Sequence, residues 1–144
     1  MDEFEPELDD QEKRIAAILN EAESPEVSHE TLNIYQAYLE AHLKLPCFLT
    51  GIEIFDWEEY YLLGPGNQKK YETLKKTQPS YHDTFKFIKF HDETDETYGL
   101  MVNVKRVSDN RKFTLPWADL KSSDLKSGNY QLIHDYVVWF VNNR

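Results

Sequence analysis

Cysteine, glycine and long apolar runs are all scarce in this chain of 144 residues. Cys47 is the single cysteine, so no internal disulfide can form, and the reducing cytoplasm is the expected location. No apolar run approaches the roughly 18 residues of a membrane-spanning helix. The chain opens with acidic residues, whereas a secretory signal opens with basic ones, so we expect neither a membrane span nor a signal peptide.

Basic residues are also in short supply. The chain has 26 Asp and Glu against 16 Lys and Arg, which gives a formal net charge of −10. Such a balance disfavours binding to the phosphate backbone of nucleic acids or to an anionic membrane surface. It is compatible with a metal ion or a basic protein partner. We therefore expect no nucleic-acid partner and no membrane partner.

The negative charge gathers at one end of the sequence. Residues 1–30 hold eleven acids and two bases, a net −9, whereas residues 31–144 hold fifteen acids and fourteen bases, a net −1. This division predicts an acidic leader over residues 1–30 and a single, nearly neutral domain over residues 31–144. The lysines of residues 69–76 are the expected counter-charge for the leader.

Apolar residues at helical spacing predict four helices. A short amphipathic helix is expected within residues 10–22, and a longer one over residues 25–43, where a Ser-Pro-Glu start signal precedes the periodic stretch. Residues 67–77 predict a short exposed helix. The last helix is expected to begin after a cap at Ser127 or Asn129 and to run to the end of the chain.

The middle of the chain has the alternation and aromatic content of β-strands. We expect strands over residues 46–54, 58–63, 84–90, 98–107 and 111–115, separated by turn residues. Together with the helices, these strands predict an α+β domain. Its core would be a bent antiparallel sheet or a small SH3-like barrel of about five strands, flanked by the N-terminal and C-terminal helices.

Patterns that would support catalysis are weak. A His-Asp dipeptide occurs three times, beginning at His82, His91 and His134, but at least two of these fall in predicted loops or strands. Cys47 lies in an apolar run without a neighbouring base and is expected to be a buried packing residue. Residues 64–70 are rich in glycine and lysine but lack the Gly-Lys-Ser/Thr ending of a phosphate loop. We expect the protein not to be an enzyme.

Two clusters of acidic residues are candidates for cation binding. Calcium takes six to eight oxygen ligands from carboxylates, carbonyls and water. Neither cluster has the spacing of an EF-hand loop, so a polar hairpin tip is the competing interpretation of the second one. The first cluster comprises Glu53, Asp56, Glu58 and Glu59, and the second comprises Asp92, Glu93, Asp95 and Glu96.

Three stretches carry a resemblance to a known family. Residues 38–48 (YLEAHLKLPCF) join a helix end to an apolar strand containing proline. Residues 115–120 (LPWADL) and 135–139 (DYVVW) follow in the order of a Leu-Pro strand and a closing helix with paired aromatics. Over about residues 30–144 the chain resembles the small acidic calcium-binding proteins first known from cyanobacteria, where they are linked to heterocyst differentiation.

The resemblance implies a small, non-enzymatic, cytoplasmic protein that binds calcium as a buffer or a sensor. Glu40 and Asp135 are the positions nearest the family's acidic motifs, and the resemblance carries the ligand role over to them. Asp92, Asp95 and Glu96 complete the predicted calcium ligands, because they cluster in one loop.

The alternative is a protein-interaction module that has lost metal binding. Glu40-Ala41-His42 stands where the family places consecutive acids, and the domain outside the leader is nearly neutral. Exposed aromatic residues are typical anchors of protein interfaces. The residues that would line such a surface are Trp57, Tyr60, Tyr61, Tyr81 and Trp117.

Overall fold

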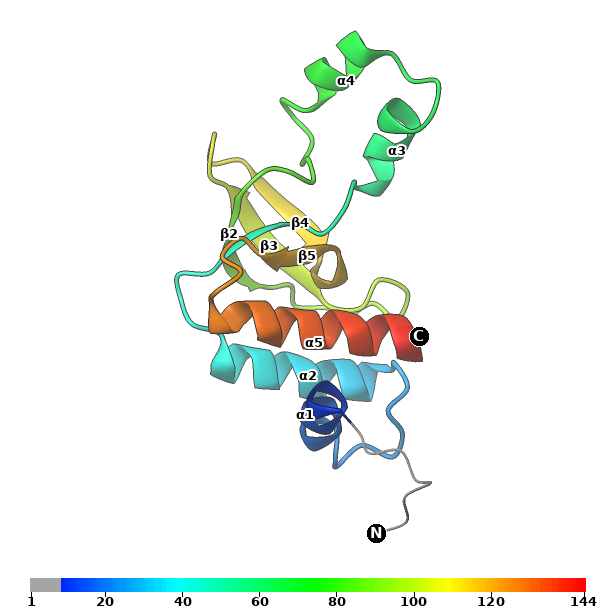
Figure 1. Cartoon of the computed structure of the whole chain (residues 1–144), viewed down its shortest axis with the longest axis vertical. Coiled ribbons are helices and arrows are strands. Elements are labelled where there is room, and N and C mark those ends of the chain that lie inside the picture. Colours follow the sequence, from blue (N-terminus) through cyan, green and yellow to red (C-terminus); the bar gives the residue numbers. More distant parts are fainter. Residues whose placement is uncertain (1–8) are drawn as a thin grey trace.

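A computed structural model describes residues 9–144, in which five α-helices accompany a five-stranded antiparallel sheet (Figure 1). The helices are α1 (Asp10–Ile18), α2 (His29–His42), α3 (Asp56–Leu62), α4 (Gln68–Leu74) and α5 (Gly128–Asn143). The strands are β1 (Phe48–Gly51), β2 (Phe85–Phe90), β3 (Met101–Arg106), β4 (Lys112–Pro116) and β5 (Leu120–Ser122). A 3₁₀ helix, η1 (Trp117–Asp119), joins the last two strands. The predicted α+β class is confirmed.

The strands are arranged in the order β4-β3-β2-β1-β5. Strand β3 shows why the sequence pattern predicted it: Val102 and Val104 are fully buried, while Asn103 and Lys105 alternate with them on the other face. The sheet therefore has one apolar face that joins the core and one polar face. A register shift in β2, between Phe87 and Lys89, interrupts its pairing with β3.

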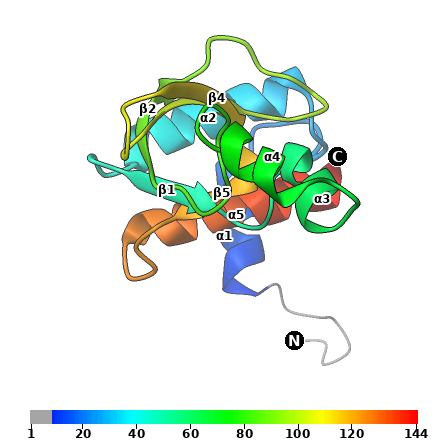
Figure 2. The same cartoon turned by 90° about the horizontal axis from the view of Figure 1, so that it is seen from above.

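Helices cover the apolar face. Helix α5 packs on β5 and η1, and α2 lies beside α5 (Figures 1 and 2). The contact between the two helices is aromatic: the Tyr35 ring on α2 stacks on Trp139 at a centroid distance of 5.1 Å and meets Tyr136 edge-on at 5.2 Å. The hydroxyl of Tyr136 accepts the backbone N–H of Leu100 at 2.9 Å, which fastens α5 to the start of β3.

Helix α1 forms a further layer on the side of α2 and α5 that faces away from the sheet (Figure 1). Its N-cap is Asp9, whose carboxylate accepts the N–H of Glu12 at 2.8 Å. The lysines of residues 69–76 lie at the opposite end of the molecule, on and after α4 (Figure 1). The expected contact between the leader and these lysines is therefore wrong for residues 9–30, and residues 1–8 lie outside the described part of the chain.

Helices α3 and α4 form an arm that projects from the sheet (Figure 1). The strand predicted over residues 58–63 is wrong, because this segment belongs to α3. Three acids, Asp56, Glu58 and Glu59, lie in the first helical turn. Their negative charge stabilises the helix there, because the N-terminal end of the helix dipole is positive. These start signals outweigh the β-preference of the aromatic residues. The fifth strand of the sheet is instead β5, which the sequence pattern did not reveal.

The other predicted elements are confirmed with changes at their ends. Helix α2 begins at His29 rather than at residue 25, because Ser28 and Thr31 form a reciprocal capping box. Helix α5 is capped by Ser127, one of the two predicted positions. Within residues 9–144, no helix is both long enough and apolar enough to cross a bilayer.

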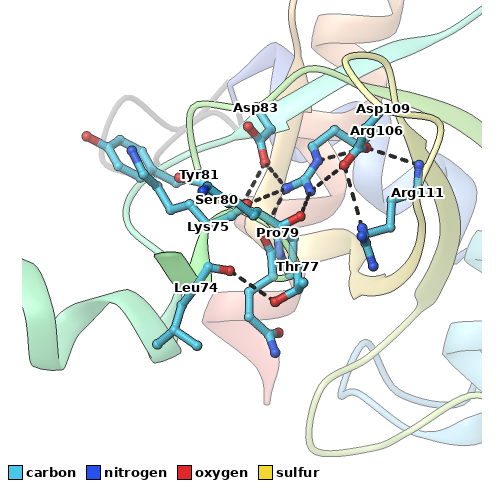
Figure 3. Close-up of polar contacts among 12 residues, drawn as sticks. Leu74, Lys75, Thr77, Pro79, Ser80, Tyr81, Asp83, Arg106, Asp109 and Arg111 are labelled. Atoms are coloured by element: carbon cyan, nitrogen blue, oxygen red, sulfur yellow. Dashed lines mark hydrogen bonds and ion pairs between the residues drawn. The ribbon is translucent and has the colours of Figure 1, made fainter. Parts of the chain in front are cut away.

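One buried arginine anchors the arm to the sheet (Figure 3). Arg106 on β3 donates to the carbonyl oxygens of Lys75, Lys76 and Gln78, which follow α4, at 2.8–3.1 Å. Its guanidinium also pairs with Asp83 at 3.0 Å and with Asp109 at 2.8 Å. Carbonyls left over at the end of a helix need donors, and this single side chain supplies them.

Candidate metal site

The loop between β2 and β3 carries three of the predicted ligands. One carboxylate oxygen of Asp95 accepts the N–H groups of Thr97 at 2.7 Å and Tyr98 at 3.1 Å. These bonds stabilise the turn that begins at Asp95. The carboxylate of Glu96 faces Nε2 of His29 at 3.5 Å. Asp92 is exposed in the same loop. The loop thus holds three carboxylates close in sequence, two of which have contacts within the protein.

The two ligands carried over from the family motif lie elsewhere. Glu40 is exposed near the end of α2, where its carboxylate accepts Nε2 of Gln36 at 3.0 Å. Asp135 is buried on α5, and its two oxygens accept from Arg14 at 2.7 and 3.0 Å and from Gln11 at 2.9 Å. The five predicted ligands therefore occupy three separate places in the fold.

Within residues 9–144, no three His, Cys, Asp or Glu side chains are arranged to hold a metal ion as they stand. The His-Asp dipeptides illustrate this, since the three lie in different elements and two of their carboxylates face arginines. Asp83 pairs with Arg106, and Asp135 pairs with Arg14. Such ion pairs occupy these carboxylates without a metal.

Glu58, from the first acidic cluster, is completely buried on α3. Its carboxylate accepts the hydroxyls of Tyr71 at 2.6 Å and Ser80 at 2.7 Å, and the N–H groups of Tyr81 at 2.9 Å and Phe55 at 3.2 Å. Four donors satisfy the hydrogen-bonding capacity of this buried carboxyl group without a cation. The residue joins α3 to α4 and to the segment before β2, so its role is to hold the arm together.

The rest of that cluster lines a hollow of about 260 Å³ that we call the acidic hollow. It lies between the segment from β1 to α3, the 3₁₀ helix η1 and the end of α5. Apolar residues line part of it, with Phe55, Ala118 and Val137 among them, and Arg144 lines it as well. Its carboxylates belong to Glu53, Asp56, Glu59 and Asp119.

Pairing of β1 with β5 creates this juxtaposition. Gly51 lies opposite Leu120, and the N–H of Ile52 donates to the carbonyl of Asp119 at 2.9 Å. The residues that follow β1 are thereby brought beside η1, although about 65 positions separate them in the chain. Asp119 stands in the LPWADL motif and the other three in the first acidic cluster, so the sequence contained both halves of the hollow. Nothing local indicated that the halves meet.

The electrostatics of the hollow favour a bound cation. Burial raises the pKa of Asp119, and the neighbouring carboxylates of Asp56 and Glu53 raise it further, whereas Arg144 lowers it. Carboxylates that raise the pKa of a neighbour repel one another, and a cation between them relieves both the repulsion and the loss of hydration. Four carboxylates supply only oxygen donors, which is the ligand chemistry of calcium rather than of zinc or copper.

The aromatic residues of the alternative interpretation do not share one surface. Trp117 is completely buried in the core and contacts Phe90 at a centroid distance of 4.9 Å. Trp57 is half-buried in the arm, where its Nε1 donates to the carbonyl of Pro79 at 2.6 Å. Tyr60 is exposed at 58%. Cys47 is buried at 1% exposure, so its predicted packing role is confirmed.

Two solved structures have a similar fold. The crystal structure of CcbP from Anabaena is 16% identical in sequence, with a TM-score of 0.60 over 94% of this chain and 93% of that chain. A calcium-binding protein in its calcium-binding form is 17% identical, with a TM-score of 0.57 over 92% of this chain and 90% of that chain. No protein-family model matches this chain, and no curated protein matches it. The predicted resemblance is thus confirmed at the level of the fold.

Proposed function

We propose that this protein binds calcium in the acidic hollow. The observation that carries the proposal is the convergence of four carboxylates on one hollow, and the raised pKa of Asp119 beside Asp56 and Glu53 supports it. The similar fold of a calcium-binding protein in its calcium-binding form supports the choice of metal. Calcium would be held by the carboxylates of Glu53, Asp56, Glu59 and Asp119 after their side chains turn toward the ion.

The chain's own residues prepare this site in three ways. The strand pair β1–β5 fixes the backbone on both sides of the hollow, so the two segments that carry the carboxylates are held side by side before the ion arrives. Apolar side chains on one part of the lining, such as Phe55 and Val137, reduce the local hydration and strengthen the attraction between carboxylate and cation. Arg144 supplies a positive charge at the same hollow, which partly offsets the repulsion between the acids.

The loop of Asp92, Asp95 and Glu96 is the second place at which calcium could bind. We rank it below the acidic hollow because two of its three carboxylates already have partners. Asp95 accepts two backbone N–H groups, and Glu96 faces His29. Glu40 and Asp135 lie elsewhere in the fold and add no ligand to either place. The carboxylate of Glu40 contacts Gln36, and that of Asp135 contacts Arg14 and Gln11.

We further propose a buffering role in the cytoplasm without enzymatic activity. Cys47 is buried as a free thiol, which suits a reducing compartment. A sensor needs an element that changes its conformation on binding. The acidic hollow is instead bounded by a paired strand and a helix that are held in place by the core, which favours buffering over sensing.

Calorimetric titration with calcium tests the proposal, with magnesium as the control ion. The site variant is Asp56→Asn/Asp119→Asn, and the matched control is Asp92→Asn/Asp95→Asn, which removes the same charge from the loop. We expect the site variant to weaken calcium binding at least about tenfold and the loop variant to change it less than about twofold.

Three results would decide against the proposal. The absence of binding heat at millimolar calcium would remove calcium binding altogether. A loss confined to the loop variant would assign the site to residues 92–96. Equal binding of magnesium and calcium would indicate general attraction to negative charge, because a built calcium site discriminates by size and ligand number.

A further inference from the structure

A row of three lysines crosses the polar face of the sheet. Lys86 on β2 lies directly opposite Lys105 on β3, and Lys105 lies directly opposite Lys112 on β4. Directly opposite residues share one face of an antiparallel sheet, with Cβ atoms about 5 Å apart. The exposed Phe48 on β1 extends the same row, because it is paired with Lys86. Lys89, two pairs further along β2, adds a fourth ammonium group to what we call the lysine face.

The lysines of this face form no ion pair within the described residues. Among residues 9–144, no carboxylate lies within 4 Å of the ammonium groups of these four lysines, although other lysines and arginines do form such pairs. The neighbouring positions on β3 are buried, Val104 in the core and Arg106 against the arm, so Lys105 is directed to the open side. Like charges placed directly opposite each other destabilise a sheet.

The face also has a place for apolar contact. A hollow of about 440 Å³ lies beside Lys89 and Lys112, and the exposed side chain of Ile88 borders it. Together with Phe48, this residue offers apolar surface beside the four positive charges. The polar residues that line the hollow are Lys89, His91, Asn103, Lys112 and Thr114.

Residues 1–8 of the chain, which lie outside the described part, have the complementary composition. Their sequence, MDEFEPEL, holds four acids and no base, together with Phe4 and Leu8. Four carboxylates match the four lysines in number, and two large apolar side chains match Phe48 and Ile88. Such complementarity of charge and apolar surface is what directs specific association.

The layers of the fold separate this segment from the lysine face of its own copy. Asp9 precedes α1, which lies beyond α2 and α5, on the side away from the sheet (Figure 1). Two packed layers of this kind put the sheet about 20 Å from α1. A chain advances at most about 3.5 Å per residue, so Glu7 and Glu5 reach only about 7 and 14 Å from Asp9. Glu3 and Asp2, at about 21 and 25 Å, reach the sheet only if the segment is fully extended, and the lysine face lies on its far side.

We propose that residues 1–8 of one copy bind the lysine face of a second copy. The contact is heterologous, because the segment and the face are different surfaces, and it can therefore join two copies reciprocally or many in a row. It also gives a role to the unequal charge distribution, since the acidic leader of one copy neutralises the sheet of the next. The proposal does not depend on calcium binding in the acidic hollow.

Sedimentation of the full chain at rising protein concentration tests the proposal. We expect the average mass to increase with concentration at low ionic strength and to return to that of one copy at high salt, because the contact is mainly between exposed charges. The variant Lys86→Gln/Lys105→Gln/Lys112→Gln should associate roughly tenfold more weakly. The matched control Lys69→Gln/Lys70→Gln/Lys76→Gln removes equal charge from the arm and should associate like the unchanged chain.

A mixing experiment establishes the direction of the contact. The leader variant should remain monomeric, as should the lysine-face variant. The leader variant carries Asp2→Asn/Glu3→Gln/Glu5→Gln/Glu7→Gln. A mixture of the two should form pairs, because one still has its face and the other its leader. Circular dichroism checks that each variant folds, and Lys86→Gln/Lys112→Gln, which spares the half-buried Lys105, serves if the triple variant unfolds.

Other outcomes would overturn the inference. A chain that stays single at every concentration has no such contact. Association that survives in the lysine-face variant but is lost in the arm variant would move the contact to α4. Tighter binding of a short single-stranded oligonucleotide than of the synthetic peptide of residues 1–8 would make the lysine face a nucleic-acid surface instead.

Discussion

Arg14 and Asp135, which are 121 positions apart in the chain, form the ion pair that joins α1 to α5. The guanidinium donates to both carboxylate oxygens, at 2.7 and 3.0 Å, and this contact raises the pKa of Arg14. Asp135 lies deeper than its partner, with its side chain 4% exposed. A two-pronged contact of this kind fixes both the distance and the orientation of the two helices.

Asp135→Asn should therefore act on stability and leave calcium binding intact. The substitution keeps the shape of the side chain but removes the charge that Arg14 and Gln11 contact, so we expect the midpoint of thermal unfolding to fall by about 5 °C. Glu30→Gln, at an exposed position of α2, is the control and should change the midpoint little. A variant with unchanged stability and lost calcium heat would instead assign Asp135 to a metal site.

Arg106→Lys should loosen the arm. A lysine cannot reach the three carbonyls after α4 and the two carboxylates together, so we expect the free energy of unfolding to fall by about 3 kcal/mol in urea denaturation. The exposed Arg111→Lys should have a much smaller effect. Equal effects of the two variants would contradict the anchoring role of Arg106.

The same arginine predicts a dependence on acid. Hydrogen bonds from Arg106 hold the pKa of Asp109 well below its usual range. A carboxyl group whose pKa is lower in the folded state stabilises the fold at neutral pH, and this contribution is lost as the pH falls from the unfolded value through the folded one. Arg106→Lys should therefore move the acid-unfolding midpoint, followed by circular dichroism, to higher pH.

Asp119→Asn should stabilise the metal-free protein while removing its response to calcium. The pKa of Asp119 is raised in the folded state, so its charged form opposes folding above the ordinary Asp value, increasingly as the pH rises toward neutrality. In the presence of a chelator at pH 7, the thermal midpoint of the variant should rise by about 3 °C. With calcium, the unchanged chain should have the higher thermal midpoint of the two, because only it gains stability from the ion.

Cys47 should react very slowly while the protein is folded. Burial raises the pKa of its thiol to about 11, two units above the reference value of 9.0. At pH 8 this lowers the thiolate fraction about a hundredfold relative to an ordinary cysteine, and the closed surroundings slow attack further. A colorimetric thiol reagent should modify Cys47 rapidly only in denaturant, and fast labelling of the native protein would contradict the buried position.

Much of the fold was predictable because its signals are local. The alternation around Val102 and Val104 depends only on neighbouring residues, and so does the cap at Ser127. The wrong strand prediction at residues 58–63 arose because local signals conflict there and contacts distant in sequence decide the outcome. Aromatic residues favour a strand, but three acids in a first turn and the buried hydrogen bonds of Glu58 favour the helix, and only tertiary contacts reveal those bonds.

The sequence by itself determined the class of the fold, most of its elements, the concentration of charge in residues 1–30 and the resemblance to small calcium-binding proteins. The tertiary structure decided which charged groups meet. Asp119 reaches Asp56 and Glu53 because β5 pairs with β1, and Lys105 meets two other lysines because three strands share one register. Register between distant strands is set by the burial of one sheet face and by the turns, so residues far apart in sequence acquire neighbours that no local pattern indicates.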